Sequence, residues 1–222
     1  METATSVVET AAGPGLRERK KRRTRDALLR SALELFAVQG YEGTTVDEIA
    51  DAVDVSQRTF FRYFANKEET VFAVAEMAEE HFVRTLRARP PGEAPLEALR
   101  RAALESWDTI GETVGSVVPV DVLMRTCQLI ESTPVLFAAH LRRSMELEER
   151  VARLIAEREG LDAATDPRPR VAVALFGGVL RATERLWSTG EDLSVAAIRR
   201  LTTEHLDAVA PALTGGWREH AR

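Results

Sequence analysis

The chain has few of the residues on which disulfide scaffolds and membrane spans depend. Among its 222 residues Cys127 is the single cysteine, so no disulfide can form within the chain and a reducing compartment is expected. The longest uncharged apolar runs, such as residues 171–180, reach ten residues and fall well short of the roughly 20 that cross a bilayer. Residues 1–16 lack the apolar centre of a signal peptide. We therefore expect a cytoplasmic protein without a membrane partner.

Sequence motifs of helical and metal-dependent enzymes are also missing. None of the four histidines has a carboxylate three residues before it, as di-iron bundles require. No His-Glu-x-x-His sequence, phosphate-binding loop or nucleophile elbow occurs. Cys127 with the distant His140 is a weak candidate for a nucleophile and its base, because a buried helical cysteine is usually inert. We expect no catalytic residues, no metal and no cofactor.

What the chain does contain favours helices. Hydrophobic residues make up 45% of it and aromatic residues 6%, and alanine, leucine, glutamate and arginine are abundant. Strand-like alternation and internal repeats are absent from the sequence, so the expected fold is all-α. The net charge is −5, yet residues 17–67 hold eleven basic and eight acidic side chains. A mildly acidic protein can still bind DNA through such a basic end.

The segment of residues 44–67 predicts two short helices joined by a tight turn. Thr45 and Glu48 have the spacing of a capping box, so a helix should begin directly after Thr45. Asp54 lies where the chain must turn, and aspartate tolerates a left-handed conformation better than most residues. Ser56 is a suitable N-cap for the second helix. The pattern is typical of a helix-turn-helix, in which the second helix lies in the DNA major groove.

The second helix, expected over residues 57–63, would expose an aromatic side chain on its outward face. Val55, Phe60 and Phe64 should point inward. The outward side chains would then be Gln57, Arg58, Thr59, Phe61 and Arg62. Because Phe61 would be exposed beside two arginines, we expect another molecule to cover this face.

A first helix is expected from about Lys20 to Gln39, ended by Gly40, and a basic block around its start precedes the helix-turn-helix. Residues 17–30 carry eight basic and two acidic side chains. Next to a helix-turn-helix, such a block favours contact with nucleic-acid phosphates over a solvated tail. The residues of this basic arm are Lys20, Lys21, Arg22, Arg23 and Arg25.

Residues 25–72 resemble the DNA-binding domain of the TetR family, the tetracycline-repressor-like regulators. The resemblance covers about a fifth of the chain and combines many spaced positions. These are Ala32, Leu33, Glu34, Leu35, Phe36, Gly40, Tyr41, Thr44, Thr45, Val46, Ile49, Ala50, Val55, Ser56, Phe60, Tyr63, Phe64, Lys67 and Glu68. It implies an all-helical homodimer with a three-helix N-terminal DNA-binding domain and a larger C-terminal domain for ligand binding and dimerisation. On this basis we expect a flexible tail at residues 1–16, the DNA-binding domain at 17–66 and the C-terminal domain at 67–222.

The resemblance also implies roles for single residues. Thr45 and Lys67 would donate hydrogen bonds to phosphates at helix starts, and Tyr63 fits the family's phosphate-contacting aromatic residue. Gln57, Arg58 and Thr59 would face base edges. With Thr44, Phe61 and Arg62, these complete the residues expected at the DNA.

Three positions depart from the commonest pattern of the family. Asp54 replaces the usual glycine of the turn, Arg58 stands where glycine is frequent, and Phe61 stands where tyrosine is common. Phe61 has no hydroxyl group and offers only apolar contact, for example with a thymine methyl group. The operator preferences of relatives therefore do not carry over to this chain.

The function implied by the resemblance is a ligand-responsive repressor. A homodimer would bind a palindromic double-stranded operator, and a small-molecule effector would release it by changing the tilt of the fourth helix. The alternative of a helical adaptor that does not bind DNA is disfavoured, because Arg58, Arg62 and Lys67 are all present.

The remainder of the chain predicts further helices. They are expected from Lys67 to about Ala88, Pro95 to about Thr113, from Pro119, from Pro134 to Glu159, from Pro169 to about Thr189, and from Ser194 to about Ala210, with a linker at residues 89–95 and an end at Pro211. The most apolar of these, near residues 169–189, is expected at the dimer interface or in the central core. Its Gly177 and Gly178 indicate either close helix approach or a pocket wall.

Inward residues of the middle helices are the candidates for an effector pocket. Aromatic residues and methionines at this spacing more often form plain core, but polar residues on the same helices favour a pocket. The candidates are Trp107, Met124, Cys127, Gln128, Phe137, His140, Met145 and Phe176, with Asp121, Arg125 and Arg143 nearby. A weaker resemblance to the subgroup with acyl-CoA-like or other bulky ligands implies a bulky and largely apolar effector, whose identity stays open.

Overall fold

The computed structural model describes residues 15–213, and within that range every regular element is a helix, as the sequence predicts. The expected tail lies outside the described residues except for Gly15 and Leu16. The helices are α1 (Leu16–Gln39), α2 (Val46–Asp51), α3 (Gln57–Phe61), α4 (Lys67–Ala88), α5 (Pro95–Val114), α6 (Val120–Ser132), α7 (Pro134–Glu159), α8 (Arg168–Ser188), α9 (Val195–Asp207) and α10 (Val209–Leu213). No described helix is apolar over a length that would let it cross a bilayer.

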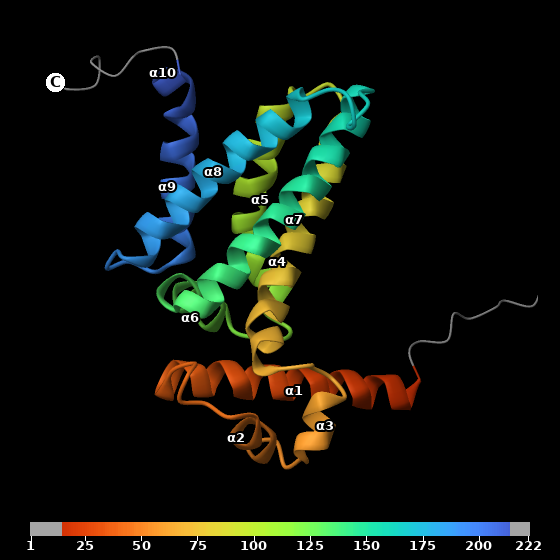
Figure 1. Ribbon diagram of the computed structural model, residues 1–222, viewed down its shortest axis with the longest axis vertical. Coiled ribbons are helices and arrows are strands. Elements are labelled where there is room, and N and C mark those ends of the chain that lie inside the picture. Colours follow the sequence, from red (N-terminus) through yellow and green to blue (C-terminus); the bar gives the residue numbers. More distant parts are fainter. Residues whose placement is uncertain (1–14, 214–222) are drawn as a thin grey trace, which may run out of the picture.

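The helices form two layers of unequal size (Figure 1). Helix α1 lies across one end of the molecule, with α2 and α3 on its outer side, and α4 to α9 rise from its other side. Helix α4 leaves this small N-terminal bundle and continues into the larger one, where it packs along α5 and α7. The three N-terminal helices are thus connected to the remainder chiefly through α1 and α4.

Local sequence signals set most of the helix ends. The expected ends are confirmed for α4 and α7: Asn66 caps α4, and Gly160 ends α7 in the left-handed conformation at φ 65°. Helix α3 ends at Phe61, two residues before the expected end, and Arg62 takes the C-cap position.

Two further boundaries differ from the sequence expectation. Helix α1 begins at Leu16 rather than near Lys20, because the lysine and arginine block is a good helix former and the Gly15 carbonyl accepts the first helical hydrogen bonds. Pro211 does not end the preceding helix. Helix α9 ends at its C-cap Ala208, and a new short helix, α10, begins at Val209. Pro211 lies in the first turn of α10, where a missing backbone N–H costs little.

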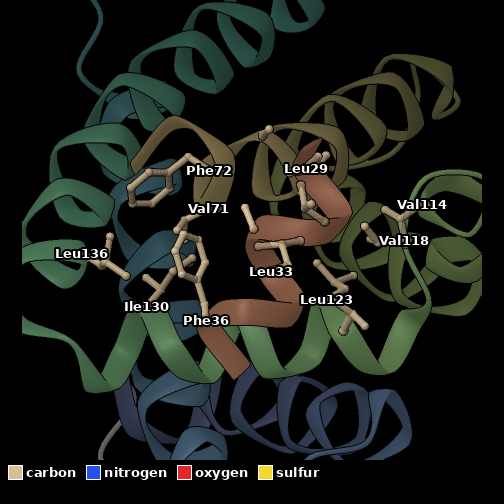
Figure 2. Packing of buried hydrophobic residues seen from close by; sticks show 14 of the residues in the cluster. Leu29, Leu33, Phe36, Val71, Phe72, Val114, Val118, Leu123, Ile130 and Leu136 are labelled. Carbon is tan, nitrogen blue, oxygen red and sulfur yellow. The ribbon is translucent and has the colours of Figure 1, made fainter. Parts of the chain in front are cut away.

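A single apolar cluster joins the N-terminal helices to the rest of the molecule (Figure 2). Leu29, Leu33 and Phe36 of α1 lie against Val71 and Phe72 of α4 on one side. The cluster continues to residues of α5, α6 and α7, with Val114, Leu123, Ile130 and Leu136 among them. Because such interiors are close-packed, a shift of α4 or α6 must displace α1.

Candidate nucleic-acid interface and effector cavity

The turn between α2 and α3 has the geometry that the sequence predicts. The hydroxyl of Thr45 accepts a hydrogen bond from the Glu48 amide at 3.2 Å, and a Glu48 carboxylate oxygen accepts from the Thr45 amide at 2.8 Å, which completes the capping box. Asp54 is left-handed at φ 55°. The Ser56 hydroxyl accepts from the Thr59 amide at 3.2 Å and caps α3. These local features fix where α2 begins, where the chain turns and where α3 begins.

Helix α3 presents the outward face expected from the sequence. Gln57, Arg58 and Arg62 are exposed, and Phe61 is 49% exposed while its ring meets the fully buried Phe60 edge-on. Thr59 is half-buried, and its hydroxyl lies 3.0 Å from that of Ser56. The face therefore offers an amide, two guanidinium groups and one aromatic ring to a partner.

The residues expected to contact phosphates differ in whether their side chains are already hydrogen-bonded within the protein. The side chain of Thr44 is buried and its hydroxyl donates to the Gly40 carbonyl at 2.8 Å, so Thr44 does not present a side chain to DNA. The Lys67 amine is half-buried and donates to the carbonyl oxygens of Tyr41 at 2.7 Å and Thr44 at 2.9 Å. Lys67 thus fastens the start of α4 to the loop before α2, a role that sequence reasoning missed. Phosphate contact by Lys67 and by Thr45 stays a prediction.

An arginine–aromatic contact lies at the C-terminal end of α3. The Arg62 guanidinium lies 5.0 Å from the centre of the Tyr63 ring and donates to its hydroxyl at 3.4 Å. Tyr63 is half-buried, so its hydroxyl and the Arg62 guanidinium lie together at the protein surface. Both groups remain candidates for a phosphate.

The basic arm forms the first turns of α1. Lys20, Lys21, Arg22 and Arg23 are exposed there. Arg25 differs from them, because it is half-buried and its guanidinium lies 5.1 Å from the centre of the Phe64 ring. Arg25 therefore holds α1 against the segment that follows α3.

The larger helices form a partly open cavity of about 220 Å³, lined mostly by apolar side chains of α4, α5, α6, α7, α8 and α9. Four of the predicted pocket residues line it: Trp107, Cys127, His140 and Phe176. Their contact with a ligand stays a prediction. Burial raises the pKa of the Cys127 thiol to about 12, so this thiol is protonated at neutral pH.

Other predicted pocket residues lie elsewhere because they occupy different faces of α6 and α7. Met124 is buried in the cluster shared with α1, and Phe137 is half-buried outside the cavity lining. Gln128 donates to the Ser188 carbonyl at 3.2 Å, and Met145 is 69% exposed. These four residues do not line the cavity, and their contact with an effector stays a prediction.

Three polar residues expected near the pocket, Asp121, Arg125 and Arg143, also lie outside the cavity, whereas His140 lines it. Asp121 and Arg125 form an exposed ion pair at 2.6 Å. Arg143 pairs with Glu76, and its guanidinium lies 4.8 Å from the centre of the Phe72 ring. The cavity takes its polar groups from other positions.

Acidic residues that sequence reasoning missed supply most of the charge. The lining includes Glu79, Glu131, Glu148 and Glu184, with Arg181 and His140. Glu79 and Glu184 each interrupt an otherwise apolar stripe of their helix, which is the sequence signal that could have found them. Glu148 pairs with Arg181. Gly177 lines the cavity, and a Cβ atom at this position would overlap the Glu148 carboxylate.

Burial and mutual repulsion perturb the ionisation of this group. Burial raises the pKa of Glu79, and burial together with the neighbouring Glu184 raises the pKa of Glu131. Burial alone would lower the pKa of His140. The carboxylates of Glu184, Glu131 and Glu79 outweigh that effect and raise the His140 pKa above its usual range.

Comparisons with known proteins agree with this geometry. Residues 28–74 match the family described as bacterial regulatory proteins, tetR family, and residues 93–214 match the MftR C-terminal domain. The HTH-type transcriptional regulator TcmR of Streptomyces glaucescens is 46% identical over 215 residues, which are 96% of this chain and 94% of that protein. The putative mycofactocin biosynthesis transcriptional regulator MftR of Mycobacterium tuberculosis is 29% identical over 169 residues, which are 74% and 79% of the two chains.

Solved structures share the same fold. A SmeT–triclosan complex superposes with a TM-score of 0.61 at 19% identity, over 86% of this chain and 91% of that one. A transcriptional regulator from Aquifex aeolicus superposes with a TM-score of 0.52 at 18% identity, over 84% and 99%. The sequence relatives are transcriptional regulators rather than enzymes. The helix-turn-helix, the helical fold and these matches together show that the chain belongs to the TetR family of DNA-binding transcriptional regulators.

Proposed function

We propose that this protein is a cytoplasmic, homodimeric repressor that binds a palindromic operator and is released from it by a bulky, largely apolar effector. The observation that carries this proposal is the course of α4. The helix begins at Lys67, which is bonded to the loop before α2, and then lines the cavity with Ala75, Ala78, Glu79 and Phe82. A ligand in the cavity therefore contacts the same helix that holds the DNA-binding domain.

A second route connects the cavity helices to the DNA-binding domain. The Arg30 guanidinium of α1 donates twice to the Val117 carbonyl, at 3.3 Å and 3.0 Å, in the segment between α5 and α6. Leu123 and Ile130 of α6 line the cavity and also belong to the apolar cluster that holds α1. An effector that binds the two arrangements of α4 and α6 with different affinity would shift the protein between them.

The exposed face of α3 supports base recognition. Gln57 and Arg58 occupy the first turn of the helix, the part of a recognition helix that contacts base edges. An arginine reads guanine by two hydrogen bonds in the major groove. The exposed basic arm on α1 would add phosphate contacts, which supply affinity without sequence preference.

An uncovered apolar stripe on α8 supports the homodimer. Val171 is 65% exposed and Leu186 52% exposed, and both lie on the same face of α8. Between them, Ala174, Gly178 and Ala182 repeat at helical spacing and carry no large or charged side chain. A second copy packed on this face would bury the stripe and place two recognition helices about a two-fold axis.

The mostly apolar lining supports a bulky apolar effector. Triclosan occurs in the SmeT complex, and lauroyl-CoA occurs in the complex of Thermus thermophilus FadR, a protein of similar fold that is 21% identical to this chain. The lining of the cavity here includes two tryptophans and two phenylalanines, which provide a large apolar contact area.

Two measurements test the proposal. Light scattering should give a dimer, and anisotropy titration should give two chains per operator duplex. Leu186→Glu should produce monomers and lose operator binding, whereas Val135→Glu, at an exposed apolar position of α7 outside the stripe, should leave both unchanged. Operator binding by a monomeric Leu186→Glu protein with unchanged affinity would contradict the proposed dimer.

A further inference from the structure

The cavity has a polar wall formed by acidic side chains from four helices. Glu131 of α6, His140 of α7 and Glu184 of α8 place side-chain ligand atoms within 4.8 Å of one another. The nearest approach of His140 to Glu184 joins Nε2 to a carboxylate oxygen at 3.7 Å. Glu79 of α4 lines the same cavity, and its charge interacts with that of His140.

The positive charges of the lining do not balance these carboxylates. The lining contains four glutamates, one arginine and one histidine, so its net charge is −3 with His140 neutral and −2 with His140 protonated. The one arginine, Arg181, is paired with Glu148. Glu79, Glu131 and Glu184 are therefore left with His140 as the cation within the lining.

Cations just outside the lining already have other partners. Arg143 and Arg150 are the arginines whose charges act on Glu79. Arg143 pairs with Glu76, and Arg150 pairs with Glu80 at 2.8 Å. Arg185, which acts on Glu131, is exposed to solvent. The pKa values of Glu79 and Glu131 are raised because these carboxyl groups are buried without sufficient positive charge beside them.

Aromatic side chains complete the cavity. Phe82, Trp107, Phe176 and Trp187 line it. Aromatic faces attract cations, and the attraction grows when both groups are shielded from water. In addition, the Trp187 side chain is 1% exposed and its indole nitrogen has no hydrogen-bond partner within residues 15–213. An unpaired buried donor is costly, so a ligand with an acceptor at this position would gain affinity.

We propose that the effector is an organic cation, with a large apolar body that contains rings and one protonated amine or amidine group. The positive group lies between Glu79, Glu131 and Glu184, and the rings fill the aromatic part of the cavity. This inference rests on the proposed function and narrows its ligand class. It excludes fatty acids that would place their carboxylate in the cavity, because that negative charge would meet uncompensated carboxylates.

A divalent metal ion would satisfy the same carboxylates and the histidine. A single ion, however, fills only a small part of a cavity of about 220 Å³ whose lining is mostly apolar. The apolar part of the cavity therefore favours an organic ligand over an ion alone.

Three probes that share one tricyclic ring system and carry a positive, a neutral or a negative substituent test the inference. They are 9-(aminomethyl)anthracene as the cation, 9-anthracenemethanol as the neutral analogue and 9-anthracenecarboxylate as the anion, each measured by equilibrium dialysis with the full chain at pH 7.5. We expect the cation to bind at least about tenfold more tightly than the alcohol, and the carboxylate to bind most weakly. Zinc chloride alone, titrated by calorimetry, forms a fourth arm.

Substitutions of the cavity glutamates test where the positive group of the ligand binds. Glu131→Gln and Glu184→Gln should each weaken binding of the cation about tenfold and change binding of the alcohol by less than about twofold. Glu146→Gln, at an exposed position of α7, is the matched control and should bind all three probes like the parent protein. Thermal unfolding of each variant shows whether it is folded before its affinity is compared.

The outcomes separate this inference from the proposed function. Equal binding of the three probes, binding of none, or tight binding of zinc without preference for the organic cation would overturn the inference. Selective binding of the cation that is lost in Glu131→Gln and Glu184→Gln would support it. If that cation fails to release the operator, the proposed release step fails while the inferred ligand charge stands.

Discussion

Replacing Lys67 by methionine should destabilise the junction between α4 and the DNA-binding domain. The amine donates to the carbonyls of Tyr41 and Thr44 and lies 4.3 Å from the centre of the Tyr41 ring. Methionine keeps most of the apolar stem and removes the positive charge with its donors. The substitution therefore isolates the contribution of the ammonium group.

The expected loss of stability follows from these contacts. A hydrogen bond from a charged group contributes roughly 1.5–3 kcal/mol when buried, and a cation–aromatic contact roughly 0.5–1 kcal/mol at an exposed site. Because Lys67 is half-buried, water replaces part of the lost interaction. We expect the free energy of unfolding to fall by about 2 kcal/mol.

Urea unfolding and DNA binding at several salt concentrations separate this structural role from phosphate contact. Lys20→Met, at an exposed position of the basic arm, is the control. It should leave the unfolding midpoint unchanged and reduce the slope of log affinity against log salt by about 1. The opposite pattern for Lys67→Met, with an unchanged midpoint and a slope reduced by about 1, would refute the reasoning and assign Lys67 to a phosphate.

Three further substitutions or reactions test other parts of the account. Arg58→Ala should weaken operator binding by about 1–3 kcal/mol and relax the preference at one base pair, as a set of single-base operator variants would show; an equal loss on all sequences would assign Arg58 to a phosphate. Arg30→Met removes both bonds to the Val117 carbonyl, so it should weaken effector-induced release more than operator binding itself. Unchanged release in an anisotropy assay would show that this contact does not transmit the signal. Cys127 should react with iodoacetamide at pH 8 far more slowly in the folded protein than in urea, because burial raises its pKa to about 12; equal rates would contradict the raised pKa.

Local signals made the N-terminal helices predictable. The capping pair of Thr45 and Glu48, the left-handed Asp54 and the N-cap Ser56 act over three or four residues, and each has its predicted conformation. Because these signals set where α3 begins and Phe60 points into the core, the residues on the outward face of α3 could be predicted. Pro211 shows the limit of such signals, because a proline is compatible with either the end or the first turn of a helix.

The cavity was less predictable because its lining depends on how six helices pack. Cys127 and Met124 lie three residues apart on α6, yet one lines the cavity and the other is buried in the cluster shared with α1. Periodicity identifies the buried side of a helix without saying which neighbour covers each position. The acidic wall was missed for a related reason, since Glu79 and Glu184 come together only through the fold.

Selection of bound sequences from random duplexes tests the central claim most directly. The purified protein would be mixed with the duplexes at about 150 mM salt, which suppresses nonspecific phosphate contacts. We predict a near-palindrome whose half-sites are separated by a whole number of helical turns, and Arg58→Ala should alter its consensus. Recovery of sequences without a shared motif, from a protein shown to be folded and free of ligand, would contradict base recognition by α3.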